Sequence, residues 1–99
     1  MKRREGFERL EQEIVKEKAA ALGRTGERLE AALDEVAALG RALDTETDPT
    51  RRAALLRQYG SARDQAALAR TMLLVQREAI GLRHHRVVDQ LFPEPRRRS

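Results

Sequence analysis

Three arginines and a histidine recur every seven residues along one stretch of the chain: Arg63, Arg70, Arg77 and His84. Seven residues make two turns of an α-helix, so the four side chains would form a row along one helical face. Guanidinium groups bind carboxylates and phosphates, because each group offers several donors in one plane. Two interpretations are open: the row pairs with acidic residues of the same chain, or it binds an external polyanion such as a nucleic acid.

The two halves of the chain carry opposite net charges, which suits both interpretations. Residues 1–48 carry −3 and residues 49–99 carry +7, within a total of +4. Within the chain, the acidic side of the first half offers partners for the row: Glu27, Glu30, Asp34 and Glu35. For an external polyanion, a basic tail at 93–99 supplies further cations: Arg96, Arg97 and Arg98. Aromatic residues that would stack on bases do not alternate with these cations.

His85 and Asp89 have the i,i+4 spacing of two metal ligands on one helical face. Two ligands make a weak site, the chain has no cysteine, and Arg83 and Arg86 oppose the binding of a cation. Glycine-rich phosphate loops, nucleophile elbows and zinc-ligand spacings are also missing. We therefore predict no catalytic residue, no cofactor site and no metal site, and a protein that is not an enzyme.

A helical repeat must position these residues, and it is clearest in the first half of the chain. From Val15 to Leu43 apolar and small residues step by four and three, which predicts an a/d seam on a helix over about 5–44. Gly23 and Gly26 could divide this helix, because Thr25 between them has the chemistry of an N-cap. The unbroken register favours a continuous or gently kinked helix through 23–26.

A polar turn at 45–48 precedes a second helix, since Asp48 can cap that helix and Pro49 suits its first position. The second helix is predicted to run from 49 to about 91, with this seam: Tyr59, Ala66, Leu73, Ile80 and Val87. Phe92 before Pro93 ends it, and within the basic tail at 93–99 we expect residues 95–99 to be disordered. A turn this short makes the helices antiparallel neighbours, so the predicted fold is all-α, one helical hairpin over residues 1–99.

The stretch 68–85 is the most apolar in the chain, and its apolar residues spread over roughly half of a helical wheel. One neighbouring helix requires an apolar stripe only about 100° wide. We therefore expect a second copy of the chain on the remaining side, in a homodimer that forms a four-helix bundle or coiled coil. The predicted interface consists of Leu68, Met72, Val75, Ala79 and Leu82.

Composition points to long helices, because aromatic residues make up only 3% of the chain and charged residues 36%. No signal peptide or long apolar span is recognisable, so a cytoplasmic location is expected. Seventeen arginines against three lysines suggest a GC-rich, bacterial genome. The predicted function is a non-enzymatic interaction module, namely an adaptor, small regulator or assembly factor, that self-associates through the second helix. The alternative is a nucleic-acid-associated protein that uses the arginine row and the basic tail.

Overall fold

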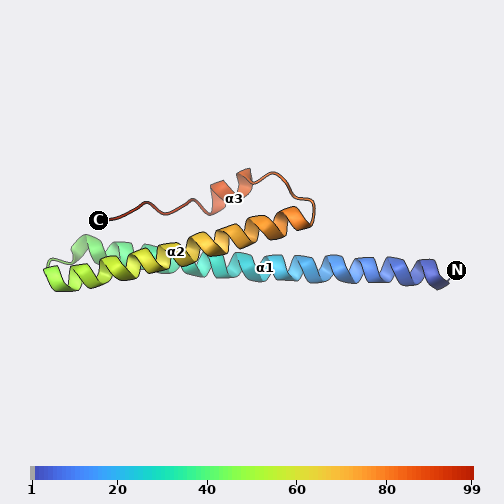
Figure 1. The fold of residues 1–99 in the computed structure, drawn as a ribbon, viewed down its shortest axis with the longest axis horizontal. Helices are drawn as coiled ribbons and strands as arrows, with labels where there is room; N and C mark the ends of the chain where they lie inside the picture. The colour runs from blue at the N-terminus through green and yellow to red at the C-terminus, as the bar shows by residue number, and fades with distance from the viewer. Residues whose placement is uncertain (1) are drawn as a thin grey trace.

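The computed structural model describes residues 2–99, with side chains from Glu5 onward, and contains three helices (Figure 1). α1 spans Lys2–Thr45, α2 spans Pro49–Ala79 and α3 spans Arg86–Leu91. α1 and α2 pack against each other as a long antiparallel hairpin. The described part of the chain has no strand, so the protein is all-α. None of its helices is long and apolar enough to cross a membrane.

α1 runs without interruption through Gly23 and Gly26. Thr25 does not cap a second helix there, because its side chain is buried, with 1% exposed, and its hydroxyl donates a 3.0 Å hydrogen bond to the carbonyl of Ala21. A hydroxyl satisfied by the preceding helical turn can lie in a packed interface without breaking the helix.

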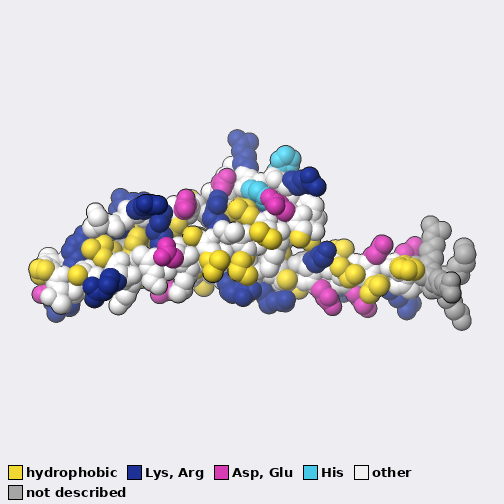
Figure 2. Space-filling view, viewed as in Figure 1, with side chains coloured by type: hydrophobic (Ala, Val, Ile, Leu, Met, Phe, Trp, Pro, Cys, Tyr) yellow, Lys and Arg dark blue, Asp and Glu magenta, His cyan; other side chains and the backbone are white. Residues whose placement is uncertain are grey.

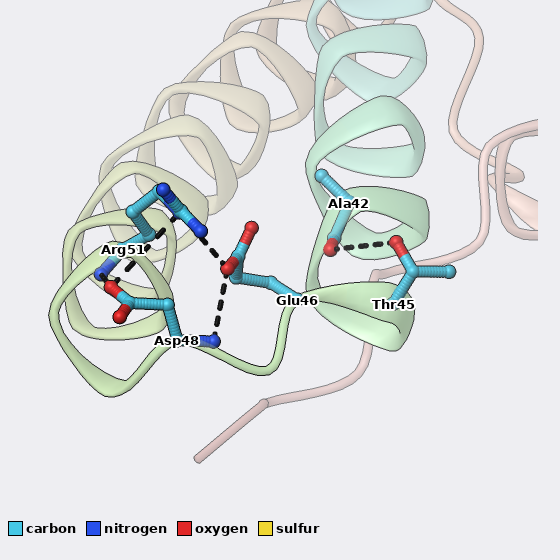
Figure 3. Close-up of polar contacts among 5 residues, drawn as sticks. All are labelled: Ala42, Thr45, Glu46, Asp48 and Arg51. Carbon is cyan, nitrogen blue, oxygen red and sulfur yellow. Dashed lines mark hydrogen bonds and ion pairs between the residues drawn. The ribbon is translucent and has the colours of Figure 1, made fainter.

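The turn between α1 and α2 is held by three residues that hydrogen-bond to one another (Figure 3). The Oε1 atom of Glu46 accepts from the Asp48 backbone N–H at 3.0 Å and from the Arg51 Nε at 3.2 Å. Oδ2 of Asp48 in turn accepts from the Arg51 backbone N–H at 3.0 Å. Asp48 is therefore the N-cap of α2, and Pro49 follows at the start of the helix, where a missing N–H costs no hydrogen bond.

The carboxylate of Glu46 makes this turn sensitive to acid. The Asp48 N–H and then the Arg51 guanidinium donate to it, and they hold the pKa of Glu46 below its ordinary value. Because the folded pKa lies below the unfolded one, the charged carboxylate stabilises the hairpin above the ordinary pKa, and this contribution is lost as the pH falls through the lowered pKa. We expect Glu46→Gln to lower the urea midpoint at neutral pH, and the two midpoints to converge in acid. The same difference at both pH values would contradict this role.

The core of the hairpin consists of two clusters. The cluster near the turn contains Val36, Leu43, Tyr59, Ala62 and Ala66. The second cluster contains Leu29 and Leu73, together with Val88 from α3. Residues that step by seven on both helices thus form the interface, as the predicted seams require: Leu29, Val36 and Leu43 on α1, and Tyr59, Ala66 and Leu73 on α2.

α2 ends at Ala79, well before the predicted end near residue 91. The chain leaves the helix through a Schellman motif, in which the Leu82 N–H donates to Arg77 O at 2.9 Å and the Gly81 N–H donates to Glu78 O at 3.0 Å. Gly81 adopts a φ of +89°, which glycine reaches without strain. The predicted second half of the seam is therefore wrong: Ile80 and Val87 are exposed, and Val88 is buried instead.

After this motif the chain turns back, and residues 84–99 run along the hairpin towards the turn between α1 and α2 (Figure 1). We call residues 84–99 the strap. The tail at 93–99 is part of it and is not disordered, because the Tyr59 hydroxyl donates to Arg96 O at 2.7 Å and the Arg98 guanidinium donates to Gly40 O at 3.2 Å. Pro93 and Pro95 oppose helix formation in the tail, and side chains of α2 donate instead to the carbonyl groups of Pro95, Arg96 and Ser99.

Because α2 is shorter than α1, the first part of α1 projects beyond the hairpin as a single helix (Figure 1). We call residues 5–20 the arm; every residue in it is exposed. Hydrophobic side chains lie along the arm between acidic and basic ones (Figure 2), with Phe7 67% and Val15 65% exposed. The part of the Val15–Leu43 seam that lies on the arm is therefore not packed against α2.

Candidate functional site

The arginine row lies on the side of α2 that faces the strap, and the strap supplies its hydrogen-bond partners. The Nε atom of Arg63 donates to Pro95 O at 2.9 Å, and an Nη atom of Arg77 donates to His84 O at 2.9 Å. Arg70 forms an ion pair with Asp89. His84, the predicted fourth member of the row, contributes its backbone carbonyl, since α2 has ended before it.

The predicted pairing of the row with acidic residues of α1 is not what the structure shows. Within residues 5–99 the row forms no ion pair with Glu27, Glu30, Asp34 or Glu35, and all four carboxylates are exposed. The core clusters explain this, because they use the faces of both helices that meet, and the row lies beside that interface rather than in it. The intramolecular partner of the row is therefore the strap and not α1.

Several nitrogen atoms of these arginines are buried without a hydrogen-bond acceptor. They are Nε of Arg70, Nε of Arg77 and Nη1 of Arg52, a neighbour whose Nη2 donates to Ser99 O at 3.4 Å. A buried donor without an acceptor destabilises the state that contains it. The strap consequently satisfies only part of the hydrogen-bonding capacity of this surface.

The three arginines of the basic tail are in different environments. The Arg98 guanidinium pairs with Asp44 and lies 5.7 Å from the centre of the Tyr59 ring. Arg96 and Arg97 are exposed, although the Arg96 carbonyl accepts the hydrogen bond from Tyr59. Only Arg96 and Arg97 of the tail thus present their guanidinium groups to solvent.

His85 and Asp89, which have the spacing of two metal ligands, bind different partners. The Nε2 atom of His85 lies 2.9 Å from Oε1 of Glu78, while Asp89 pairs with Arg70. Among the described residues, no group of three or more histidine, cysteine, aspartate or glutamate side chains is placed to hold a metal ion.

The predicted oligomer interface forms an exposed apolar stripe on the opposite side of α2 from the strap. Leu68 is 63% exposed, Met72 42% and Val75 60%, and Ala79 is exposed as well. Leu82 is 42% exposed but lies just beyond the end of α2. Four of the five predicted residues therefore share one face of a single helix.

The strap is not among the elements predicted from the sequence. Its signals were Gly81 followed by the apolar Leu82, which is the pattern of a Schellman ending, and the single apolar residue Leu74 on the arginine side of α2. Leu74 packs on the second core cluster together with Phe92 of the strap. An apolar residue beside the arginine row, half-buried in the structure, indicates that another segment covers this side of the helix.

No protein-family model, curated protein or solved structure matches this chain. Two sides of α2 carry the features on which a function can depend: the exposed apolar stripe and the arginine row beneath the strap.

Proposed function

We propose that this protein is a non-enzymatic helical interaction module that self-associates through the apolar stripe of α2. The observation that carries the proposal is the alignment of Leu68, Met72, Val75 and Ala79, all exposed, on one face of a helix. A single exposed leucine is ordinary on a protein surface, whereas an aligned set of large apolar side chains marks an interaction site.

The stripe suits a second copy of the same chain. The opposite face of α2 is packed on α1, so the stripe lies on a supported helix and needs no rearrangement to meet a partner. Two identical stripes related by a two-fold axis cover each other, and two hairpins joined in this way form a four-helix bundle. Such a homodimer, located in the cytoplasm, would act as an adaptor, a small regulator or an assembly factor.

A role in nucleic-acid binding has less support. It depends on the arginine row and the tail, but the strap covers Arg63, Arg70 and Arg77, and Arg98 is engaged with Asp44. The exposed guanidinium groups of Arg96 and Arg97 would give only a weak attraction that depends strongly on salt.

The proposal is tested by placing a charge in the stripe. We expect the unmodified chain to be a dimer by light scattering at micromolar concentration, and the double variant Leu68→Glu, Val75→Glu to be a monomer, because two carboxylates would be desolvated in the interface. The circular dichroism of the variant should keep its helical signal, since both positions are exposed within one chain.

The matched control is Ala67→Glu, which adds a carboxylate at an exposed position next to Leu68, about 100° away around the helix. This variant should remain a dimer. A monodisperse monomer of the unmodified chain, or a double variant that still dimerises, would refute self-association through the stripe.

A further inference from the structure

A groove between α1 and α2 holds the strap, and its chemistry can be read from the strap's contacts. Leu29 of α1 and Leu73 of α2 form its floor, on which Val88 is buried to 2% exposure and Phe92 packs one turn later. The arginine row forms one wall and accepts a carboxylate, Asp89, beside these two apolar residues. The site thus takes a short helix with apolar residues at i and i+4 and an acidic residue between them.

The strap is a poor electrostatic match for this groove. Residues 84–99 contain four arginines and two carboxylates, a net charge of +2, and they cover the arginine row. Of these four arginines, Arg98 pairs with Asp44 of α1 and the other three are exposed. In the described part of the chain, Asp89 is the one carboxylate of the strap that pairs with the row, while Arg63 and Arg77 donate to backbone carbonyls. Arg52, Arg70 and Arg77 all contact the strap, and each still has a buried nitrogen without an acceptor.

The strap is also weakly held. Val88 is its one fully buried residue, Leu91 is 66% exposed, and a shallow cleft remains between the strap and α1, lined by Ala37 and Pro93 among others. Fixing the backbone of each residue of an irregular segment opposes docking. In each of the strap's three ion pairs among the described residues one partner is 59–64% exposed, so solvent screens the attraction.

A released strap has an alternative conformation, in which part of it continues α2 along α1. If α2 continued through residue 81, its seven-residue register would bring Ile80 and Val87 opposite Leu22 and Val15 of α1, in continuation of the layer formed by Leu29 and Leu73. Val15 is 65% exposed and Val87 43% exposed in the present arrangement. Release would therefore exchange one set of apolar contacts for another.

We propose that this groove is a binding site for an acidic, amphipathic segment of a partner protein, and that the strap is the internal occupant which such a segment displaces. The partner segment carries two apolar residues one helical turn apart, which replace Val88 and Phe92. Its additional carboxylates accept hydrogen bonds from Arg63, Arg70 and Arg77 in the two-oxygen geometry that guanidinium groups favour. This site lies on a different side of α2 from the self-association stripe, so either proposal can fail without the other.

The test uses the full chain with the substitution Val88→Asp, which removes the buried anchor of the strap. Two labelled synthetic peptides serve as probes: residues 84–99 in the native sequence, and the same peptide with the exposed Arg86, Arg96 and Arg97 replaced by glutamate and with Arg98, the partner of Asp44, kept. By fluorescence anisotropy, we expect the acidic peptide to bind this variant at least about tenfold more tightly than the native-sequence peptide does. The unmodified chain should bind the acidic peptide about a hundredfold more weakly, because its own strap is present at a high effective concentration.

Val87→Asp is the matched control, since it places the same charge one residue away on an exposed side chain and should bind the acidic peptide as weakly as the unmodified chain does. A second opened variant, Asp89→Arg, places a cation next to Arg70 in place of the ion pair and leaves the core residues unchanged, so the test does not depend on Val88→Asp being folded. Adding Arg70→Gln and Arg77→Gln to either opened variant should abolish the binding of the acidic peptide.

Tyr59 is the one tyrosine in a chain without tryptophan, so its fluorescence reports strap release directly.

Three results would overturn the proposal. The first is a helical, strap-released variant that binds neither peptide. The second is equal affinity for the native-sequence and acidic peptides, which would remove the argument from charge. The third is an opened variant that binds duplex DNA at physiological salt but does not bind the acidic peptide. This result would make the groove a phosphate-binding site instead.

Discussion

Replacing Gly81 with alanine is expected to straighten α2 and release the strap. Gly81 has a φ of +89°, a region in which a β-carbon costs about 1–2 kcal/mol. In a continuous helix, alanine is favoured over glycine by about 1 kcal/mol. Both effects favour the continuous helix over the bent structure, by roughly 2–3 kcal/mol in total. The ratio of the continuous to the bent form should therefore rise by a factor of about thirty or more.

Three measurements check this prediction. The helical signal in circular dichroism should rise. The tyrosine fluorescence should change, because the Tyr59 hydroxyl loses its hydrogen bond to the Arg96 carbonyl. The hydrogen-exchange rate of the Phe92 amide, which donates to Val88 O in the bent structure, should also change.

Gly60→Ala is the matched control, because Gly60 lies inside α2 with open space around its α-carbon. It should stabilise the hairpin by about 0.5–1 kcal/mol and leave the tyrosine signal unchanged. A destabilised Gly81→Ala variant that keeps its native tyrosine signal would show that the bend does not depend on glycine.

Truncation of Leu29 is expected to destabilise the hairpin more than any other leucine-to-alanine change in the chain. Leu29 is fully buried, with 0% exposed, at the place where α1, α2 and α3 meet through Leu73 and Val88. Removing such a side chain typically costs about 2–5 kcal/mol, because transfer energy is lost and a cavity remains. That is a large fraction of the 5–15 kcal/mol by which small domains are stable.

Urea unfolding followed by circular dichroism measures this loss, at a protein concentration low enough to keep both variants monomeric. Leu68→Ala is the matched control, since it removes the same atoms from a leucine that is 63% exposed. Its unfolding free energy should stay within about 0.5 kcal/mol of the unmodified value. Equal losses for the two variants would mean that the second core cluster does not hold the three helices together.

Local signals were enough to predict the hairpin. Asp48 and Pro49 specify the start of α2 through their own backbone chemistry, and the seven-residue spacing on both helices specifies which faces meet. The exposed stripe at Leu68, Met72 and Val75 also followed from the sequence, because residues at this spacing share a face of any helix. These features depend on residues close together in the chain, so they do not require knowledge of the remote contacts.

The end of α2 and the partner of the arginine row depended on contacts between distant residues. Ile80 and Val87 continue the helical repeat, while Gly81 and Leu82 favour a Schellman ending, so the local signals conflict at this point. The bent arrangement gains the burial of Val88 and Phe92 on Leu29 and Leu73. Only the tertiary structure shows this gain, because Leu29 lies more than fifty residues before Val88 in the chain. The same contacts place the strap over Arg63, Arg70 and Arg77, which explains why a row of cations recognisable from spacing alone had a partner that spacing could not identify.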